Sequence, residues 1–429
     1  MERMSNYAAT VVKISNLRPH SNADRLICTN IFGNNVIVGK ETKIGDVGLF
    51  FPLESQIGKE FAENNDLIRR KDEKGKPAGG MFDENRRVRA QTFRGEKSMG
   101  FWIPIDCLKF AGLEDYYRNF GDGMEIEKLN DLTISQKYIP RNANMPGSGK
   151  KKEGRKPRES RIIPDQFRFH FDTAQLGKNI HKLKVDDLIA ITWKLHGTSA
   201  IAGNCLVKRP MSIFTKILDK LGVPVQFSTY DYIWASRRVV KNQFESDKQH
   251  FYTEDLWFRV GKELFEGKLH QGEQVYYEIV GYTQDGGMIQ KDFDYHCEPG
   301  TCKAYIYRIT QTGSDGTVFE LSWLQVKQRS LELGVSHVPE IYYRPVKGFF
   351  GIDGQSDDWH YQLLAILQSQ YVYDQDSQFC RNKVPEEGIC VRIEGLSIDI
   401  FKLKSFRFLE YETKQLDTGV VDLETNESI

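Results

Sequence analysis

Residues 145–160 differ sharply in composition from the rest of the chain. They contain the run Pro-Gly-Ser-Gly-Lys-Lys-Lys-Glu-Gly-Arg-Lys-Pro-Arg. Glycine, proline and repeated like charge are typical of a flexible linker. Because 429 residues exceed one typical domain, this segment predicts an N-terminal domain over 1–140, a basic linker over 141–165 and a larger domain over 166–429. The basic run is either a solvated linker only, or a linker that also contacts a nucleic-acid backbone.

Composition narrows the class of protein without pointing to a partner. Lysine plus arginine and aspartate plus glutamate both number 59, so any nucleic-acid surface must arise from local segregation of charge. The seven cysteines include no C-x-x-C pair, which favours reduced thiols in a cytosolic setting over a disulfide framework or a zinc site. The N-terminus lacks an apolar signal core, and no run approaches the length of a membrane span. We therefore expect a soluble, intracellular, cytoplasmic protein that does not enter membranes.

The first 52 residues alternate short β-rich runs with turns. Strands are expected over 9–14, 26–31, 36–38 and 47–51, and strands this short and closely spaced suggest a small antiparallel barrel. The segment Pro-His-Ser-Asn-Ala-Asp-Arg-Leu at 19–26 resembles the opening of tRNA-binding-type OB modules. This resemblance implies an OB-like barrel.

Arginines alternate with apolar residues farther along the same domain. Arg87, Arg89 and Arg94 precede Phe101-Trp102, and a sheet face of this kind can neutralise phosphates and stack bases. The alternative is a strand with a solvated arginine face and buried aromatic rings. We predict that these three arginines bind RNA.

A lysine at the end of a buried strand is the main catalytic candidate. The apolar run 188–191 leads to Lys194-Leu195-His196-Gly197, so the lysine projects from a rigid element beside a turn. A solvated lysine is almost wholly protonated near neutral pH, so an amine nucleophile needs neighbouring cations or desolvation. Lys402 and Lys404 lie two residues apart and would share one strand face. We predict that all three lysines meet in one phosphate-binding cleft.

The rest of the larger domain mixes helical and strand patterns. Helices are expected over 256–265, 324–333 and 359–371. Strands or extended segments are expected over 274–281, 304–309, 318–323, 338–343, 388–393 and 398–404.

Four features follow one another in order: Lys-x-His-Gly at Lys194, the strand glutamate Glu278, Glu-Gly-Ile-Cys-Val-Arg from Glu387, and Lys402-x-Lys404. The first alone would arise by chance in roughly one chain of this length in seven, but the ordered set is improbable. The set resembles the covalent nucleotidyltransferases, and among them the ATP-dependent RNA ligases. The resemblance implies an α+β chain: an N-terminal OB-like β-barrel, then a mixed α/β nucleotidyltransferase domain with ATP-grasp-like antiparallel sheets.

The resemblance also implies roles for single residues. Lys194 would attack the α-phosphorus of ATP, while Lys402 and Lys404 would contact the α-phosphate and lower the pKa of Lys194. Glu387 would help to hold Mg²⁺ or Mn²⁺. The nucleotide-binding residues implied by the same motifs are His196, Gly197, Glu278 at the ribose, Tyr307 stacked on adenine, and Arg237, for which Arg238 is an alternative.

Two positions depart from the pattern of that family. Trp193 stands where many RNA ligases have an acidic residue that contacts the adenine amino group. The preference for ATP over GTP is therefore left open. Arg308 follows Tyr307, where an aspartate is usual.

Only 25 residues follow Lys404, and an OB-like module precedes the catalytic domain instead of following it. This order resembles the group that seals nicked RNA. The expectation is a monomeric ATP-dependent ligase that acts on RNA ends or on nicked duplexes through a lysyl–AMP intermediate. The alternatives are a DNA ligase, a capping-type nucleotidyltransferase, or a non-catalytic RNA-binding protein built on the OB module.

Overall fold

The computed structural model describes residues 6–71, 75, 77–139, 160–209, 217, 220–222, 224, 226–241 and 254–418. The greater part of the expected linker, 141–159, therefore lies outside the described residues. No described helix combines the length and apolar character that crossing a membrane requires. We call residues 6–139 the N-terminal module and residues 160–418 the C-terminal module, because no sheet of the described residues takes strands from both.

The N-terminal module is built from short antiparallel strands around two larger sheets. One sheet has the order β11-β5-β1-β12, and the other has the order β2-β3-β4. Their strands are β1 (Ala9–Lys13), β2 (Arg18–Pro19), β3 (Leu26–Ile31), β4 (Asn34–Gly39), β5 (Val47–Phe51), β11 (Phe101–Pro104) and β12 (Glu125–Ile126). The strands expected at 26–31 and 47–51 are thus confirmed with their bounds.

Shorter elements complete this module. Paired strands are β6 (Ser55–Ile57) with β15 (Ser135–Lys137), β7 (Arg70–Lys71) with β8 (Pro77–Gly79), β9 (Gln91–Phe93) with β10 (Glu96–Ser98), and β13 (Lys128–Leu129) with β14 (Leu132–Thr133). The helices are α1 (Lys59–Asn64), η1 (Ile105–Ala111) and α2 (Glu114–Arg118). The described strands are divided among separate sheets and close no barrel, so the OB assignment stays a prediction.

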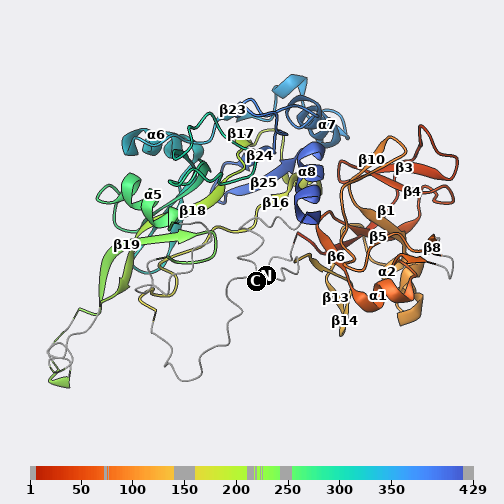
Figure 1. The fold of residues 1–429 in the computed structure, drawn as a ribbon, viewed down its shortest axis with the longest axis horizontal. Coiled ribbons are helices and arrows are strands. Elements are labelled where there is room, and N and C mark those ends of the chain that lie inside the picture. The colour runs from red at the N-terminus through yellow and green to blue at the C-terminus, as the bar shows by residue number, and fades with distance from the viewer. Residues whose placement is uncertain are drawn as a thin grey trace.

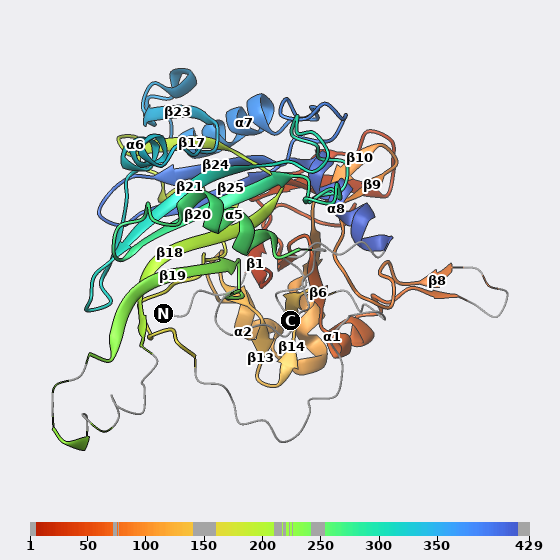
Figure 2. The same cartoon turned by 60° about the vertical axis from the view of Figure 1, so that its left-hand side comes forward.

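The C-terminal module contains two five-stranded sheets that stack on each other (Figure 2). The first has the order β16-β25-β24-β17-β23, with β16 (Ala174–Gln175), β25 (Asp399–Lys404), β24 (Gly388–Ile393), β17 (Leu188–Lys194) and β23 (Glu340–Pro345). The second has the order β19-β18-β20-β21-β22, with β19 (Ser228–Ser236), β18 (Thr198–Lys208), β20 (Glu273–Gly281), β21 (Cys302–Thr312) and β22 (Val318–Glu320). All neighbours are antiparallel except β16 and β25, so the mixed α/β, antiparallel class that we expected is observed.

Helices pack around this pair of sheets. They are α3 (Leu176–Asn179), η2 (Ile180–Lys182), α5 (Leu256–Phe265), α6 (Trp323–Leu333), η3 (Phe349–Gly351), α7 (Trp359–Tyr371) and α8 (Phe406–Asp417). One apolar core joins β17 to the second sheet, α5 and α6, and another joins β17, β24 and β25 to α7. The helices expected at 256–265 and 359–371, and the strand at 388–393, are confirmed with their bounds.

Helix α8 lies between the two modules (Figure 1). The Lys97 ammonium of the N-terminal module lies 4.6 Å from the centre of the Phe406 ring at the start of this helix. Ser405 caps α8, since its hydroxyl accepts a hydrogen bond from the Phe408 amide. We had not expected this helix from the sequence, and it supplies several of the residues described below.

Candidate active site

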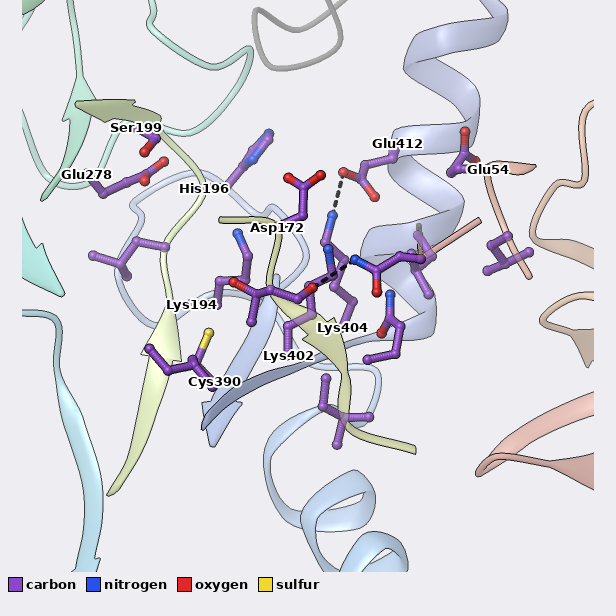
Figure 3. Close-up of a pocket in the computed structure, with 18 of the residues that line it drawn as sticks. Glu54, Asp172, Lys194, His196, Ser199, Glu278, Cys390, Lys402, Lys404 and Glu412 are labelled. Atoms are coloured by element: carbon purple, nitrogen blue, oxygen red, sulfur yellow. Dashed lines mark hydrogen bonds and ion pairs between the residues drawn. The ribbon is translucent and has the colours of Figure 1, made fainter. Parts of the chain in front are cut away.

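Strand register brings the two lysine motifs together. Lys194 at the end of β17 pairs with Gly388 of β24, and Gly388 pairs with Lys404 of β25. One step along the same face, Cys390 separates Thr192 from Lys402 in the same way. The three lysines therefore project from β17 and β25, the two strands that flank β24, toward a single space (Figure 3).

Gly388 is required by the backbone at the centre of this arrangement. Its φ of +143° is one that side-chain-bearing residues rarely adopt. A Cβ added there would lie 2.1 Å from the carbonyl oxygen of Leu403. A glycine between Lys194 and Lys404 therefore allows β24 and β25 to approach closely at the point where the lysines meet.

The space that the lysines enter is a cavity of about 660 Å³. It extends from Ala190 and Val338 in the C-terminal module, past the lysines, to residues of the N-terminal module. The residues of the N-terminal module that line it include Tyr7, Glu54, Lys137 and Tyr138. The cavity is large enough for a nucleoside triphosphate, and residues of both modules line it.

Glu387 and Glu412 partner the lysines. The Lys194 ammonium lies 2.7 Å from Glu387 Oε1, and the Lys404 ammonium lies 3.5 Å from the same oxygen. Lys404 also donates a hydrogen bond of 2.7 Å to Glu412 on α8 (Figure 3). The Glu387 side chain is only 3% exposed, so these charges interact in a medium that screens them weakly.

The two lysines of β25 differ in their electrostatic surroundings. Burial, followed by repulsion from Lys404, Arg237 and Lys194, lowers the pKa of Lys402 to about 8. Burial also acts to lower the pKa of Lys404, but the carboxylates of Glu412 and Glu387 outweigh it and raise that pKa above its ordinary value. Lys404 is thus held as a cation, whereas Lys402 can lose its charge in mildly alkaline solution.

The turn after Lys194 is held by hydrogen bonds from three directions. The Gly197 amide donates to Glu278 Oε1 at 3.0 Å, and Gln290 donates to the Gly197 carbonyl at 2.6 Å. The His196 amide donates to the Tyr295 hydroxyl at 2.6 Å. Glu278 lines the cavity, so the strand glutamate and the turn expected to bind nucleotide do lie together.

Tyr307 and Arg237 also line the cavity. The Tyr307 hydroxyl is 2.7 Å from Ser199 Oγ, and its ring meets the His170 ring edge-on at 5.2 Å. Arg237 pairs with Asp172 at 2.5 Å, and Arg238 pairs with the other oxygen of this carboxylate at 3.1 Å. Both arginine candidates are therefore oriented by one aspartate that the sequence patterns did not indicate.

The structure shows the surroundings of Trp193 and Arg308, the two residues that differ from the ligase-like motifs. The Trp193 ring points into the core on the other face of β17, where it contacts Tyr371 and Phe379 edge-on at 5.9 and 5.8 Å. Arg308 is buried and forms two hydrogen bonds of 2.9 Å with Glu320. Arg308 is therefore engaged by Glu320 and is not among the residues that line the cavity, whereas Trp193 lines part of it.

Glu387 has the chemistry expected of a residue that holds a divalent cation. Its Oε2 is buried and accepts no hydrogen bond from the part of the chain that the structure describes. The described residues contain no cluster of three or more His, Cys, Asp or Glu side chains that could enclose a metal. A cation here would thus draw its remaining ligands from water and phosphate oxygens, as Mg²⁺ usually does.

The three arginines predicted to bind RNA occupy different environments. Arg87 is 1% exposed and lies between the modules, where it pairs with Glu54 at 2.9 Å and Asp417 at 3.2 Å. Arg89 pairs with Asp83 at 2.7 Å and also with Asp417. Only Arg94, in the turn between β9 and β10, is exposed as the alternation of residues suggested. Arg87 pairs with one carboxylate from each module, which is typical of a contact between modules. Its side chain is also too deeply buried in this arrangement to be accessible to RNA.

Several residues of the site were not anticipated from the sequence. These are Tyr7, Glu54, Asp172 and Glu412, which line the same cavity as the lysines. Figure 3 shows the last three of them. A signal for α8, and so for Glu412, was present: Ser405 is a favoured N-cap and strong helix formers follow it. No sequence pattern pairs Tyr7 or Glu54 with a lysine about 350 to 400 residues away.

The comparisons with known proteins agree with this geometry at the level of the fold. No protein family and no curated sequence matches the chain. A solved structure of a Naegleria gruberi RNA ligase mutant with AMP and Mn is similar to it, with a TM-score of 0.59 and 16% identity over 94% of this chain and 98% of that one. The structure of the same ligase with PPi has a TM-score of 0.60 and 16% identity, over 95% and 99%. At such identity the likeness establishes the shared fold.

Proposed function

We propose that this protein is an ATP-dependent RNA ligase that joins a 3′-hydroxyl to a 5′-phosphate through a lysyl–AMP intermediate. The observation that carries the proposal is the meeting of Lys194, Lys402 and Lys404 in one cavity. The buried carboxylate of Glu387 pairs with two of them, Lys194 and Lys404. The fold supports it, since the similar Naegleria gruberi structures include complexes with AMP and Mn, with ATP and Mn, and with PPi. An enzyme that forms phosphodiester bonds and uses ATP and a divalent metal accounts for each of these features.

Three transfers make up the reaction. The neutral amine of Lys194 forms a bond to the α-phosphorus of ATP while the bond to the bridging oxygen breaks, and its electron pair leaves with pyrophosphate. The nitrogen then releases a proton to water. An oxygen of the RNA 5′-phosphate next displaces the amine, which regains a proton. Finally the 3′-hydroxyl attacks that 5′-phosphorus, loses its proton and expels AMP.

The surrounding charges fit these transfers. Lys402 and Lys404 would contact the α-phosphate and offset the negative charge that develops as the bonds exchange. Glu387 would hold Mg²⁺ or Mn²⁺, which when bound neutralises charge on the crowded phosphate oxygens. Because Glu387 also pairs with Lys194 at 2.7 Å, this carboxylate would orient the nucleophile before the nucleotide enters.

Nucleotide recognition is assigned to the residues beside the lysines. Glu278 would engage the ribose while it fixes the turn that contains His196 and Gly197. Tyr307 would stack on adenine, with its ring oriented by Ser199. Arg237 would contact the nucleotide sugar or the RNA end, in a position set by Asp172.

The N-terminal module is the proposed site of RNA binding, in an OB-like manner. Its exposed Arg94 lies in the turn between β9 and β10, where it would contact the phosphate backbone. A separate module that grips duplexed RNA around a break would favour nicks over free ends.

Covalent labelling tests the first transfer. Purified protein incubated with [α-³²P]ATP and Mg²⁺ or Mn²⁺ should acquire a label that survives denaturation, and Lys194→Ala should abolish it. Lys262→Ala, which removes an exposed lysine on α5, is the control and should label normally. A label retained in Lys194→Ala would overturn the mechanism.

Sealing assays test the acceptor. Nicked duplexes that carry RNA or DNA on either side of the break should show sealing when the 3′-hydroxyl end is RNA. When the protein is incubated with [α-³²P]GTP in place of [α-³²P]ATP, covalent labelling of the protein should be weak. Equal sealing of all-DNA nicks would make the protein a DNA ligase, and labelling by GTP alone would favour a capping-type enzyme.

A further inference from the structure

Helix α8 presents two different faces to its surroundings. Glu412 lines the lysine cavity, and Phe408, four residues earlier, lies against Lys404. Thr413 and Asp417, also four residues apart, contact the N-terminal module. The helix therefore touches the proposed catalytic residues on one side and the neighbouring module on the other.

The cavity face of α8 holds two parts of the site. Glu412 accepts the hydrogen bond of 2.7 Å from Lys404, and the Lys404 ammonium lies 5.0 Å from the centre of the Phe408 ring. The same ring packs edge-on against His196 at 4.9 Å. Displacement of α8 would therefore remove a charge-assisted hydrogen bond from Lys404 and a packing partner from the turn.

The face of α8 toward the N-terminal module contacts the buried charge of Arg87, and Arg89 also pairs with Asp417 there. Arg87 of the N-terminal module donates to the Thr413 carbonyl at 3.3 Å and pairs with Asp417 at 3.2 Å. Glu54 pairs with the same guanidinium at 2.9 Å and so balances its charge inside the N-terminal module. A buried arginine that satisfies a helix carbonyl and two carboxylates holds the helix firmly, since breaking such a set leaves an uncompensated charge.

We propose that Glu412 is a positioning residue that holds Lys404 for adenylyl transfer, and that Arg87 keeps Glu412 in place through α8. The inference rests on the proposed function, because it assigns these residues to the first step of that reaction. It makes the N-terminal module part of the machinery that adenylates Lys194, before any RNA is bound.

The test of Glu412 is the single-turnover rate of labelling by [α-³²P]ATP in the full-length protein. Loss of one group that stabilises transition-state charge directly costs about 10²–10³ in rate, so loss of a group that acts through Lys404 should cost less, about tenfold. Glu412→Gln should therefore slow labelling at saturating ATP by about tenfold, with the apparent Kd for ATP changed less than about threefold. Glu410→Gln, on the exposed side of the same helix, is the matched control and should label like the wild type.

The test of Arg87 is whether its effect passes through Glu412. Arg87→Met should slow labelling like Glu412→Gln, and Arg87→Lys should restore part of the rate. The double variant Arg87→Met/Glu412→Gln should be within about twofold of Glu412→Gln, because two changes on one route are not additive. Gln368→Ala, which removes the hydrogen bond of 2.7 Å between α7 and Gly33, weakens module contact elsewhere and should leave the rate unchanged.

Each outcome decides between the claims. Absence of label on the wild-type protein would overturn the proposed function itself. Wild-type labelling together with a Glu412→Gln variant that labels at the wild-type rate would overturn only the present inference. Multiplicative losses in the double variant, or an equal loss in Gln368→Ala, would show that Arg87 acts by another route. Asp417→Asn, which keeps the buried pair of Arg87 and Glu54, should give a smaller slowing in a protein with near-normal Tm, and a normal rate there would count against the role of α8.

Discussion

Lys402 and Lys404 are two residues apart on β25, yet their surroundings shift their pKa values in opposite directions. Lys404 faces Glu412 and Glu387, whose carboxylates raise its pKa despite burial. Lys402 is buried among Lys404, Arg237 and Lys194, and its pKa falls to about 8. Because the folded pKa of Lys402 lies below its unfolded value of 10.5, its charge costs stability below pH 8, and that cost is lost as the pH rises toward 10.5.

This difference predicts how ATP affinity changes with pH. If a charged Lys402 contacts phosphate, affinity should be constant below pH 8 and should fall by up to about tenfold per pH unit above it. The measurement is equilibrium binding of an α,β-methylene analogue of ATP, which cannot transfer AMP. Lys402→Met should bind more weakly at pH 7 and lose this pH dependence. An unchanged slope in that variant would assign the titration to another group.

At the scale of single elements, the end of the chain organises the site more than any other segment. Strand β25 supplies two lysines, and α8 follows it directly after Ser405. The Ser405 hydroxyl accepts from the Phe408 amide at 3.1 Å and donates to the Glu386 carbonyl at 2.6 Å. This one side chain therefore both starts α8 and ties it to the residue before Glu387.

The cap yields a prediction at this scale. Ser405→Ala should lower the free energy of unfolding by about 1 kcal/mol and should slow self-adenylation at a temperature where the protein remains folded. The control is Asp255→Ala, which removes the N-cap of α5, a helix away from the lysine cavity. Denaturant unfolding and single-turnover labelling measure the two effects. Equal slowing in both variants would show that the loss reflects stability alone.

At the scale of the whole molecule, the two modules share one cavity and one bridging helix. The N-terminal module contributes Tyr7 and Glu54 to the cavity. Lys97 of the same module pairs with Asp374 and lies over the Phe406 ring in the C-terminal module. Lys178 of α3 reaches in the other direction to Glu125, at 3.1 Å. RNA binding and lysine adenylation are therefore expected to depend on different residues of the same module.

Arg94 and Arg87 make that separation measurable. Arg94→Ala should weaken binding to a nicked RNA duplex and reduce the dependence of log K on log salt by about one, because one phosphate contact is lost. It should leave self-adenylation unchanged. Arg87→Met should give the reverse pattern, with slow adenylation and an unchanged salt slope. The same salt slope in Arg94→Ala and the wild type would remove Arg94 from the RNA surface.

Much of the fold could be predicted because its signals are local. The pattern over 359–371 and the apolar run over 388–393 carry their helix and strand signals within one element, and the bounds agree with the structure. The OB assignment could not be decided, because barrel closure depends on pairing between distant strands. Arg87 shows the same limit: alternation with apolar residues predicts an exposed row, but the burial of one member depends on what packs against it.

The sequence by itself was enough to predict that Lys194, Lys402 and Lys404 would share a cleft. Residue spacing puts Lys402 and Lys404 on one strand face, and an amine nucleophile such as Lys194 needs cations of this kind nearby. Only the tertiary structure decided which carboxylates pair with Lys194 and Lys404, what the Trp193 ring packs against, and that Arg87 is buried against α8. The physical reason is that charge pairing and burial depend on distances between segments far apart in the chain, and these distances arise only when the modules pack.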